Sequence, residues 1–203
     1  MPSFVTPAVA GMTGMVLEYT GNVREVGAMK SPILVPHPDC PPPDSVEVAI
    51  GWTLDVELLT LEVRVSDPFH TILWPAPAVG RADDLWQTSC FEAFIGSGTG
   101  SGYAEFNLSP SGAWAAYGFD DYRIGMRDLD LTAPPQIART ASNHWQATLD
   151  LTGLADLIGP APWRLAITAV IEAEDGRKSY WSLAHPPGKP DFHHADCFAA
   201  RLG

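Results

Sequence analysis

The sequence is short of basic residues. Its 203 residues include 12 lysines and arginines against 24 aspartates and glutamates, a formal net charge of −12. No run of lysine or arginine offers a local exception. Phosphate backbones and anionic membrane surfaces repel a chain of this sign, so neither nucleic acid nor a membrane is an expected partner. A small molecule is the expected partner instead.

Cysteine and long apolar segments are also scarce. Cys40, Cys90 and Cys197 form no CxxC pair, so the spacing indicates free thiols rather than a zinc ribbon or a thioredoxin-type redox site. No apolar run approaches the roughly 18 residues of a membrane helix. The first residues show neither the basic start nor the uninterrupted apolar segment of a secretory signal. Together these absences predict a cytoplasmic protein.

Long stretches of helical periodicity are missing as well, which argues against a β-α-β architecture. What is present is two-residue alternation of apolar and polar side chains in short segments bounded by glycine and proline. The segments predicted as strands are 46–54, 57–65, 90–96, 103–109, 112–119, 144–151, 163–174 and 197–202. Trp52, Trp145 and Trp163 lie in phase with aliphatic residues and are predicted to be core. Short helices are predicted within 81–88 and 152–158. The pattern is typical of an all-β fold, an antiparallel β-sandwich.

The chain shows no internal repeat and no clear domain boundary. Its length suits one domain with a substantial core. Residues 1–44 are predicted to form an N-terminal strand and a proline-rich lead-in, part of the same domain as the sandwich of residues 45–203. The segment 31–44, "SPILVPHPDCPPPD", is interpreted as a stiff connector before the first long strands.

Two motifs in the middle of the chain suggest chemistry. The loop "GSGTGSG" (96–102) resembles a phosphate cradle, but a predicted strand follows it where a phosphate site needs a helix N-terminus, so a hairpin loop is predicted. Glu92 and Glu105 could face one another across this hairpin. Two facing carboxyl groups are what glycoside hydrolysis requires. Charged side chains on the solvated face of a sheet would produce the same pattern.

The C-terminal stretch "LAHPPGKPDFHHADCF" (183–198) concentrates histidines and prolines. His185, His193 and His194 are possible metal ligands. Adjacent histidines in an extended chain point in opposite directions, however, so both are not expected to hold one metal. Three hypotheses stay open: a structural loop held by its prolines, a loop that contacts a ligand, and a metal or catalytic site.

Four segments, in this order, resemble DOMON-like domains and the related family 9 carbohydrate-binding modules. They are "DDLWQTSCFEAFI" (83–95), "GYAEFNLSPSGAWAAYGF" (102–119), "HWQATLDLTGLADL" (144–157) and "PWRLAITAVIEAEDGRKSYWSL" (162–183). The ending "HPPGKPDFHH" is similar to a bacterial DOMON-like subgroup. The resemblance implies a jelly-roll β-sandwich that binds a sugar or haem. Aromatic rings would stack on the sugar, while amide and carboxyl groups would bind its hydroxyls.

When the binding positions of the family are matched residue by residue to this sequence, the resemblance implies a ligand-binding site. Its residues are Trp86, Glu92, Tyr103, Glu105, Asn107, Trp114, Trp181, His185 and His194. Alternation places Tyr103, Glu105 and Asn107 on one face. The predicted function is non-enzymatic binding of a carbohydrate or a similar polar ring, with no catalytic residue, metal or cofactor assigned.

Two other functions stay open beside this one. The first is binding of haem or a divalent metal through His185, His193 or His194, with Met126 and His70 as isolated haem-ligand candidates. The second is a glycoside-active enzyme that uses Glu92 and Glu105 as an acid and base pair.

Overall fold

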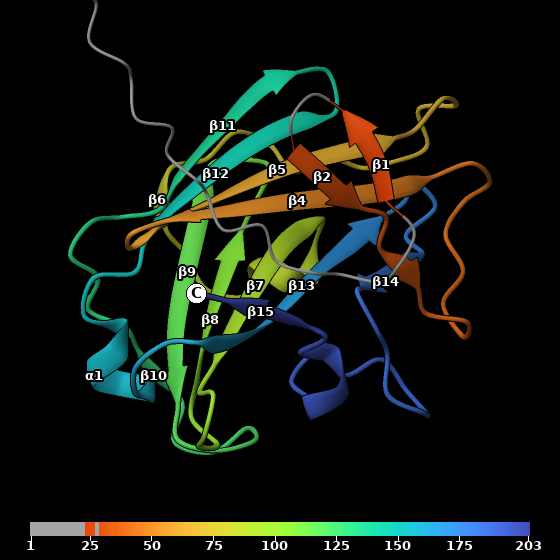
Figure 1. Ribbon diagram of the computed structural model, residues 1–203. Coiled ribbons are helices and arrows are strands. Elements are labelled where there is room, and N and C mark those ends of the chain that lie inside the picture. The colour runs from red at the N-terminus through yellow and green to blue at the C-terminus, as the bar shows by residue number, and fades with distance from the viewer. Residues whose placement is uncertain (1–22, 27–28) are drawn as a thin grey trace, which may run out of the picture.

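Two packed β-sheets make up most of the chain in the computed structural model, which describes residues 23–26 and 29–203 (Figure 1). The prediction that the first residues do not form a secretory signal concerns residues 1–22, which lie outside this part. The larger sheet has nine strands. In sheet order these are β10 (Arg127–Asp128), β9 (Ala113–Phe119), β8 (Tyr103–Leu108), β7 (Cys90–Gly96), β13 (Trp163–Glu172), β14 (Lys178–Ser182) and β3 (Val35–Pro36), with β15 (Ala200–Leu202) beside β13 and β6 (Gly80–Arg81) beside β9.

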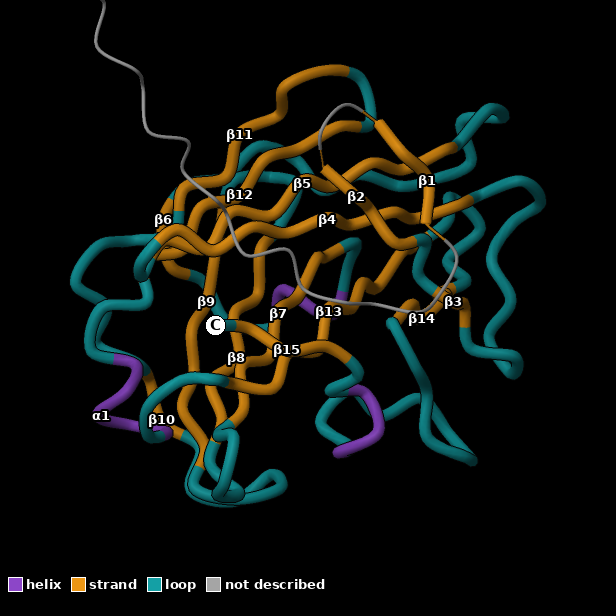
Figure 2. The backbone as a smooth tube through the Cα atoms, viewed as in Figure 1, coloured by secondary structure: helices purple, strands orange, loops and turns teal. Residues whose placement is uncertain are grey.

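The smaller sheet lies across the upper part of the larger one (Figures 1 and 2). Its order is β11 (Gln136–Ala141), β12 (His144–Asp150), β5 (Leu58–Ser66) and β4 (Glu47–Asp55), and β1 (Val23–Val26) pairs separately with β2 (Met29–Pro32). Strand pairing is antiparallel except for the short parallel contact of β6 with β9. The predicted all-β, antiparallel sandwich is therefore confirmed, whereas the jelly-roll connectivity stays a prediction.

Helices are short and lie outside the sheets. They are the 3-10 helix η1 (Leu85–Gln87), α1 (Leu154–Ile158) and the 3-10 helix η2 (Ala195–Cys197). The first two fall within the predicted segments 81–88 and 152–158. The third was not predicted, and it shortens the final strand to β15, because Cys197 belongs to a helical turn. None of the helices in the described part of the chain has the length and apolar character required to span a membrane.

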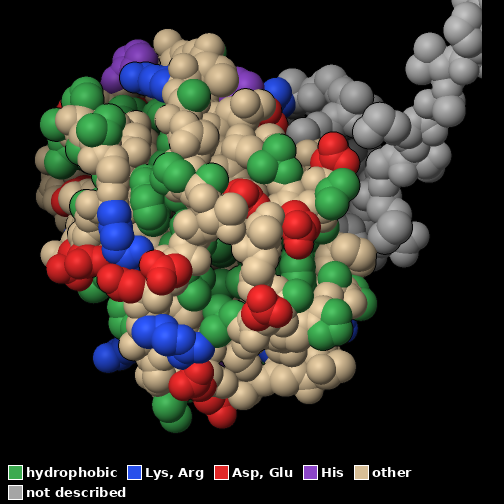
Figure 3. All heavy atoms as spheres, turned by 90° about the vertical axis from the view of Figure 1, so that its left-hand side faces the viewer, with side chains coloured by type: hydrophobic (Ala, Val, Ile, Leu, Met, Phe, Trp, Pro, Cys, Tyr) green, Lys and Arg blue, Asp and Glu red, His purple; other side chains and the backbone are tan. Residues whose placement is uncertain are grey.

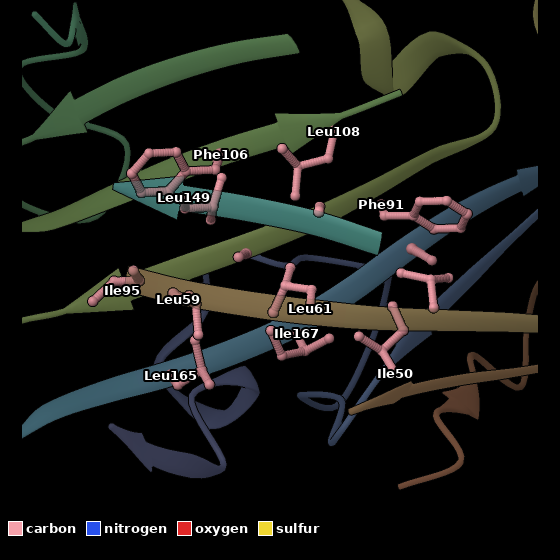
Figure 4. Close-up of a cluster of buried hydrophobic side chains, with 14 of the residues drawn as sticks. Ile50, Leu59, Leu61, Phe91, Ile95, Phe106, Leu108, Leu149, Leu165 and Ile167 are labelled. Carbon is pink, nitrogen blue, oxygen red and sulfur yellow. The ribbon is translucent and has the colours of Figure 1, made fainter. Parts of the chain in front are cut away.

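The alternating residues of both sheets meet in one hydrophobic core (Figure 4). Ile50 and Leu61 point from the smaller sheet toward Phe91 and Ile167 of the larger one. Trp145 and Trp163 are buried in this core, as predicted, and Trp52 is half-buried at its margin. Full burial of one such side chain stabilises the fold by about 1.5–3 kcal/mol, so the alternation itself dictates how the sheets stack.

The larger sheet is also covered on its outer face. Every residue of β7 is buried, including the residues that alternate away from the core. A second apolar cluster forms on this side, and Phe94, Tyr103 and Phe119 of the sheet pack there against Phe192 and Cys197. The last two belong to the C-terminal loop (residues 183–198), which runs between β14 and β15 at the lower right of Figure 1. The central strands β7 and β8 are thus buried on both faces, whereas the edge strand β10 stays exposed.

The "GSGTGSG" segment joins β7 to β8, as the hairpin prediction requires. The Ser97 hydroxyl accepts hydrogen bonds from the backbone N–H of Thr99 (3.3 Å) and of Gly100 (2.8 Å). The guanidinium of Arg164 donates to the Ser97 carbonyl at 2.8 Å. These contacts hold the loop as a tight turn at the end of the hairpin. Elsewhere on the surface, Figure 3 shows acidic side chains gathered in groups with basic side chains beside them.

Candidate ligand-binding site

A cavity of about 1020 Å³ opens on the outer face of the larger sheet. Its floor is formed by side chains from β7, β8, β9, β13 and β14. Its walls come from four connecting segments, namely the residues after β3, the region of η1, the loop that follows β9, and the C-terminal loop. This volume lies at the upper end of the range found for small-molecule pockets. The connecting segments therefore leave a cavity of ligand size over a sheet face that they otherwise cover.

Strand register decides which polar groups reach the floor. Glu92 of β7 pairs with Asn107 of β8 on one side and with Thr168 of β13 on the other. Glu105 of β8 pairs with Tyr117 of β9. Paired residues project to the same face of a sheet, so all five side chains lie on the outer face. The expectation that Glu92 and Glu105 face one another directly is corrected to a diagonal relationship, because Asn107 occupies the position opposite Glu92.

Glu92 is the most deeply buried acid of the cavity, with only 3% of its surface exposed. The Thr168 hydroxyl donates to Oε2 of Glu92 at 2.9 Å. Within the described residues, no hydrogen bond engages Oε1. Burial, and then the nearby charge of Glu105, raise the pKa of Glu92 from 4.5 to about 8. At neutral pH this carboxyl group therefore keeps its proton and acts as a hydrogen-bond donor as well as an acceptor.

Glu105 lies beside it in a more polar setting. The amide of Asn107 donates to Oε1 of Glu105 at 2.7 Å, and Nε2 of His193 lies 3.8 Å from Oε2. Burial raises the pKa of Glu105, and the Asn107 hydrogen bond and the charge of Arg123 oppose that rise. The two carboxyl groups thus differ in environment, which is a recurrent feature of binding and catalytic sites.

His193 forms part of the wall and is neutral at physiological pH. Burial, and then the charge of Arg123, lower the pKa of His193 to about 4. Its Nδ1 lies 2.8 Å from the hydroxyl of Tyr103. Burial raises the pKa of Tyr103 to about 12, so this hydroxyl keeps its proton while it is hydrogen-bonded to Nδ1. The ring of Tyr103 stacks on Phe119 at 4.5 Å, behind the cavity surface.

Two connecting segments are tied together beside the cavity. The guanidinium of Arg123 donates to Oδ1 of Asp191 at 2.9 Å, and the hydroxyl of Tyr122 donates to Oδ2 of the same carboxylate at 2.6 Å. Arg123 and Tyr122 follow β9, whereas Asp191 belongs to the C-terminal loop. These contacts fix the loop over the sheet and so define that side of the cavity.

The aromatic content of the lining is high. Phe94, Tyr117, Tyr180 and Phe192 contribute ring surfaces from three strands and the C-terminal loop. The hydroxyl of Tyr117 donates a hydrogen bond to Oδ1 of Asp83 at 2.6 Å, which fixes the position of the Tyr117 ring. Trp86 also lines the cavity and is 49% exposed, so its ring is accessible to solvent. Aromatic rings and carboxyl groups therefore line the same cavity.

The structure brings together only part of the predicted site. Trp86, Glu92 and Glu105 line the cavity, whereas Tyr103 and Asn107 hold lining residues in place through hydrogen bonds.

Four predicted residues lie away from the cavity. Trp181 is 2% exposed and faces the core between the sheets, where its Nε1 donates to Ser179. Trp114 is half-buried against the same core. His185 contacts the carbonyl of Val35 through Nε2 at 2.8 Å, and Nδ1 of His194 accepts the backbone N–H of Asp196 at the start of η2. These two histidines therefore make structural contacts within loops.

Several lining residues were not on the predicted list. Tyr117, Tyr180, Phe192 and Arg123 were missed, and Met126 and His193 had been named only for haem or metal. For Tyr117 the sequence held a signal, because it alternates in phase with Phe119 on an outward face. For Phe192 and Arg123 it held none, since both reach the cavity through irregular loops.

The three C-terminal histidines occupy separate environments. His193 lies in the cavity wall, His194 at η2, and His185 against the ring of His37 at 5.0 Å. Across residues 23–26 and 29–203, no three His, Cys, Asp or Glu side chains converge in a way that could hold a metal ion.

Comparison with known proteins adds a structural neighbour. No protein-family model and no curated protein matches the sequence. Among solved structures, the fold is similar to that of a "putative carbohydrate-binding protein" from Bacteroides uniformis, with a TM-score of 0.59. The match covers 82% of this chain and 84% of the other, at 13% sequence identity. At that identity the likeness shows a shared all-β sandwich fold.

Proposed function

We propose that this protein is a DOMON-like binding domain that takes a carbohydrate, or a similar polar ring compound, into the cavity of the larger sheet without breaking bonds. The observation that carries the proposal is the composition of the cavity. Aromatic rings of β9, β14 and the C-terminal loop surround two buried carboxyl groups, Glu92 and Glu105. The flat face of an aromatic ring matches the C–H face of a sugar ring, and carboxyl groups orient its hydroxyls.

Each carboxyl group has a distinct part in this proposal. Glu92, protonated at neutral pH, donates to one ligand hydroxyl and accepts from another. Glu105, held by Asn107 at 2.7 Å, presents its second oxygen to the ligand. Trp86 covers the ring from the mouth of the cavity. The structural neighbour supports the proposal through its fold and through its own description as a "putative carbohydrate-binding protein".

A glycan array followed by calorimetric titration tests the proposal. We expect Trp86→Ala to weaken binding of the best glycan by at least about tenfold, because the stacking face is removed. Trp114→Ala is the matched control, because Trp114 lies outside the cavity. The affinity of this variant for the same glycan should stay within about twofold of the wild-type affinity. Absence of binding to every glycan, or equal losses in the two variants, would contradict the proposal.

A second candidate function is glycoside hydrolysis. The observation that favours it is the pair of buried carboxyl groups with raised pKa values, Glu92 and Glu105, on one cavity floor. Release of a chromogenic phenol from aryl glycosides, lost in Glu92→Gln and in Glu105→Gln, would establish the activity. Binding without turnover of any aryl glycoside would favour the first proposal.

The third hypothesis, haem or metal binding through the C-terminal histidines, also stays a prediction, as does a cytoplasmic location. Visible absorbance of the purified protein and elemental analysis test the first of these directly. A Soret band that His193→Gln abolishes would point to haem in the cavity, because His193 and Met126 both line it.

A further inference from the structure

The charges that line the cavity are unbalanced. Asp39, Asp83, Asp84, Asp128 and Asp191 surround the buried Glu92 and Glu105, whereas Arg123 and Lys189 are the basic residues of the lining. An acidic wall with apolar surfaces between its charges favours a positive ligand over a negative one.

The basic groups of the lining are paired, exposed to solvent or neutral. Arg123 is bound by Asp191 at 2.9 Å, Lys189 is exposed on the C-terminal loop, and His193 is neutral. Asp83 and Asp128 both lie within ion-pair distance of Arg81, which does not itself line the cavity. Glu92 is in contact with no basic side chain of the described residues, and its Oε1 faces the cavity without a hydrogen-bond partner. A buried acid in this state is costly to ionise until a cation is placed beside it.

The apolar part of the lining suits the same ligand. Tyr180 and Phe192 line the cavity with ring centroids 6.0 Å apart and planes inclined at 60°, and Tyr117 lies on the neighbouring floor. Inclined rings beside a carboxylate are the environment in which proteins hold ammonium groups, because the ring faces carry negative partial charge.

We propose that the ligand of this cavity carries a protonated amine, as an amino sugar does, and that the amine binds at Glu92 against the aromatic rings of Tyr180 and Phe192. The inference rests on the proposed carbohydrate-binding function and specifies its ligand class. Glu92 supplies the counter-charge, the rings supply cation–π contacts, and the remaining hydroxyls of the sugar reach Glu105.

The proposal implies that binding releases a proton. Glu92 keeps its proton in the free protein because burial raises the pKa of this residue to about 8. When the amine cation arrives, the carboxyl group ionises, its proton passes to the buffer, and the new charge pair stays in the cavity. The groups around Glu92 are Cys90 on its own strand, Glu105 and Asn107 on β8, Thr168 on β13 and Tyr180 on β14. None of them is a cation that could replace the ligand in this role.

Titration calorimetry with two pairs of probes tests the inference. The pairs are glucosamine with glucose and cyclohexylamine with cyclohexanol, each differing in an amine against a hydroxyl. Near pH 7 we expect the amine of each pair to bind the wild type at least about tenfold more tightly than its partner. The binding enthalpy of the amines should vary with the ionisation enthalpy of the buffer, which reports the released proton.

Variants supply the second readout. Glu92→Gln keeps the shape of the side chain and removes the charge, so the preference for the amine should disappear. The matched control is Glu174→Gln, because Glu174 is an exposed acid outside the cavity, and its preference should equal that of the wild type. Circular dichroism and a thermal melt verify that both variants fold. The wild-type comparison stands even if Glu92→Gln does not fold.

The outcomes separate this inference from the proposed function. Binding of glucose or another neutral sugar at least as tight as that of glucosamine would overturn the inference and leave carbohydrate binding intact. Binding of cyclohexylamine but of no sugar would support the cation site and overturn the carbohydrate proposal. If none of the four probes binds, the inference is wrong.

Discussion

The hydroxyl of Tyr103 lies 2.8 Å from Nδ1 of His193, although the two residues are 90 positions apart in the chain. This contact joins β8 to the C-terminal loop. The same hydroxyl oxygen accepts the backbone N–H of Arg123 at 3.1 Å, so three segments meet at one phenol. The wall of the cavity therefore depends on a hydrogen bond located behind it.

Removing this hydroxyl should destabilise the protein. Tyr103→Phe keeps the ring stacked on Phe119 but leaves the imidazole of His193 and an amide N–H without their partner. We expect the free energy of unfolding to fall by about 1–3 kcal/mol, measured by urea denaturation. Tyr122→Phe is the control, because its hydroxyl bonds Asp191 in an exposed position and should cost less than about 1 kcal/mol. Equal losses in the two variants would count against this account.

Two tryptophans that the sequence placed in one site should behave differently. Trp181→Ala empties a buried position in the core between the sheets and should lower the free energy of unfolding by about 3–5 kcal/mol. Trp86→Ala changes a half-exposed ring at the cavity and should cost less than about 1 kcal/mol. Chemical denaturation of both variants provides the comparison. A large loss in Trp86→Ala would mean that this ring holds the fold rather than a ligand.

The strands and the core were predictable because they depend on local alternation. Trp145 alternates with leucine and alanine, and the structure buries this residue as that pattern requires. Local alternation does not determine the position of Trp181. The assignment of Trp181 to a binding site came from a resemblance, whereas its pairing opposite Ala169 of β13 places it in the core. That pairing is a long-range property that no single segment reveals.

The floor of the cavity was only partly predictable. Alternation correctly placed Glu105 and Asn107 on one face, but the pairing of Glu92 with Asn107 depends on the shape of the 96–102 loop, which sets the register. Burial of this face depends on the C-terminal loop, whose approach leaves no periodic signal. For that reason a polar face that would otherwise be solvated forms the floor of a cavity.

A glycine in the turn between β8 and β9 is predicted to be costly to replace. Gly112 has a φ of +103°, and a Cβ added there would lie 2.7 Å from the carbonyl oxygen of Ala78. Gly188 has a similar φ of +95° with open space around it. Gly188→Ala should cost about 1 kcal/mol from backbone strain alone. Gly112→Ala should cost roughly 1–2 kcal/mol more, because backbone must move. Equal losses in urea denaturation would show that the turn adapts.

The buried carboxyl group of Glu92 should make stability depend on pH in a defined direction. In the unfolded chain this group loses its proton near 4.5, whereas in the folded protein its pKa is about 8. Between these values the folded state binds more protons than the unfolded state, so the free energy of unfolding falls as the pH rises. The slope from this one group is at most ~1.4 kcal/mol per pH unit, and it vanishes above about pH 8.

The difference between wild type and Glu92→Gln isolates this contribution from that of Glu105, whose raised pKa acts in the same direction and remains in the variant. Urea denaturation of both proteins from about pH 5 to pH 9 should show the wild type losing stability relative to the variant across the window, then a constant difference. Glu174→Gln, which changes an exposed acid, should give a difference that is constant throughout. A constant difference for Glu92→Gln as well would mean that Glu92 is already ionised at neutral pH. It would then accept hydrogen bonds but could neither donate one to a ligand nor release a proton when an amine binds.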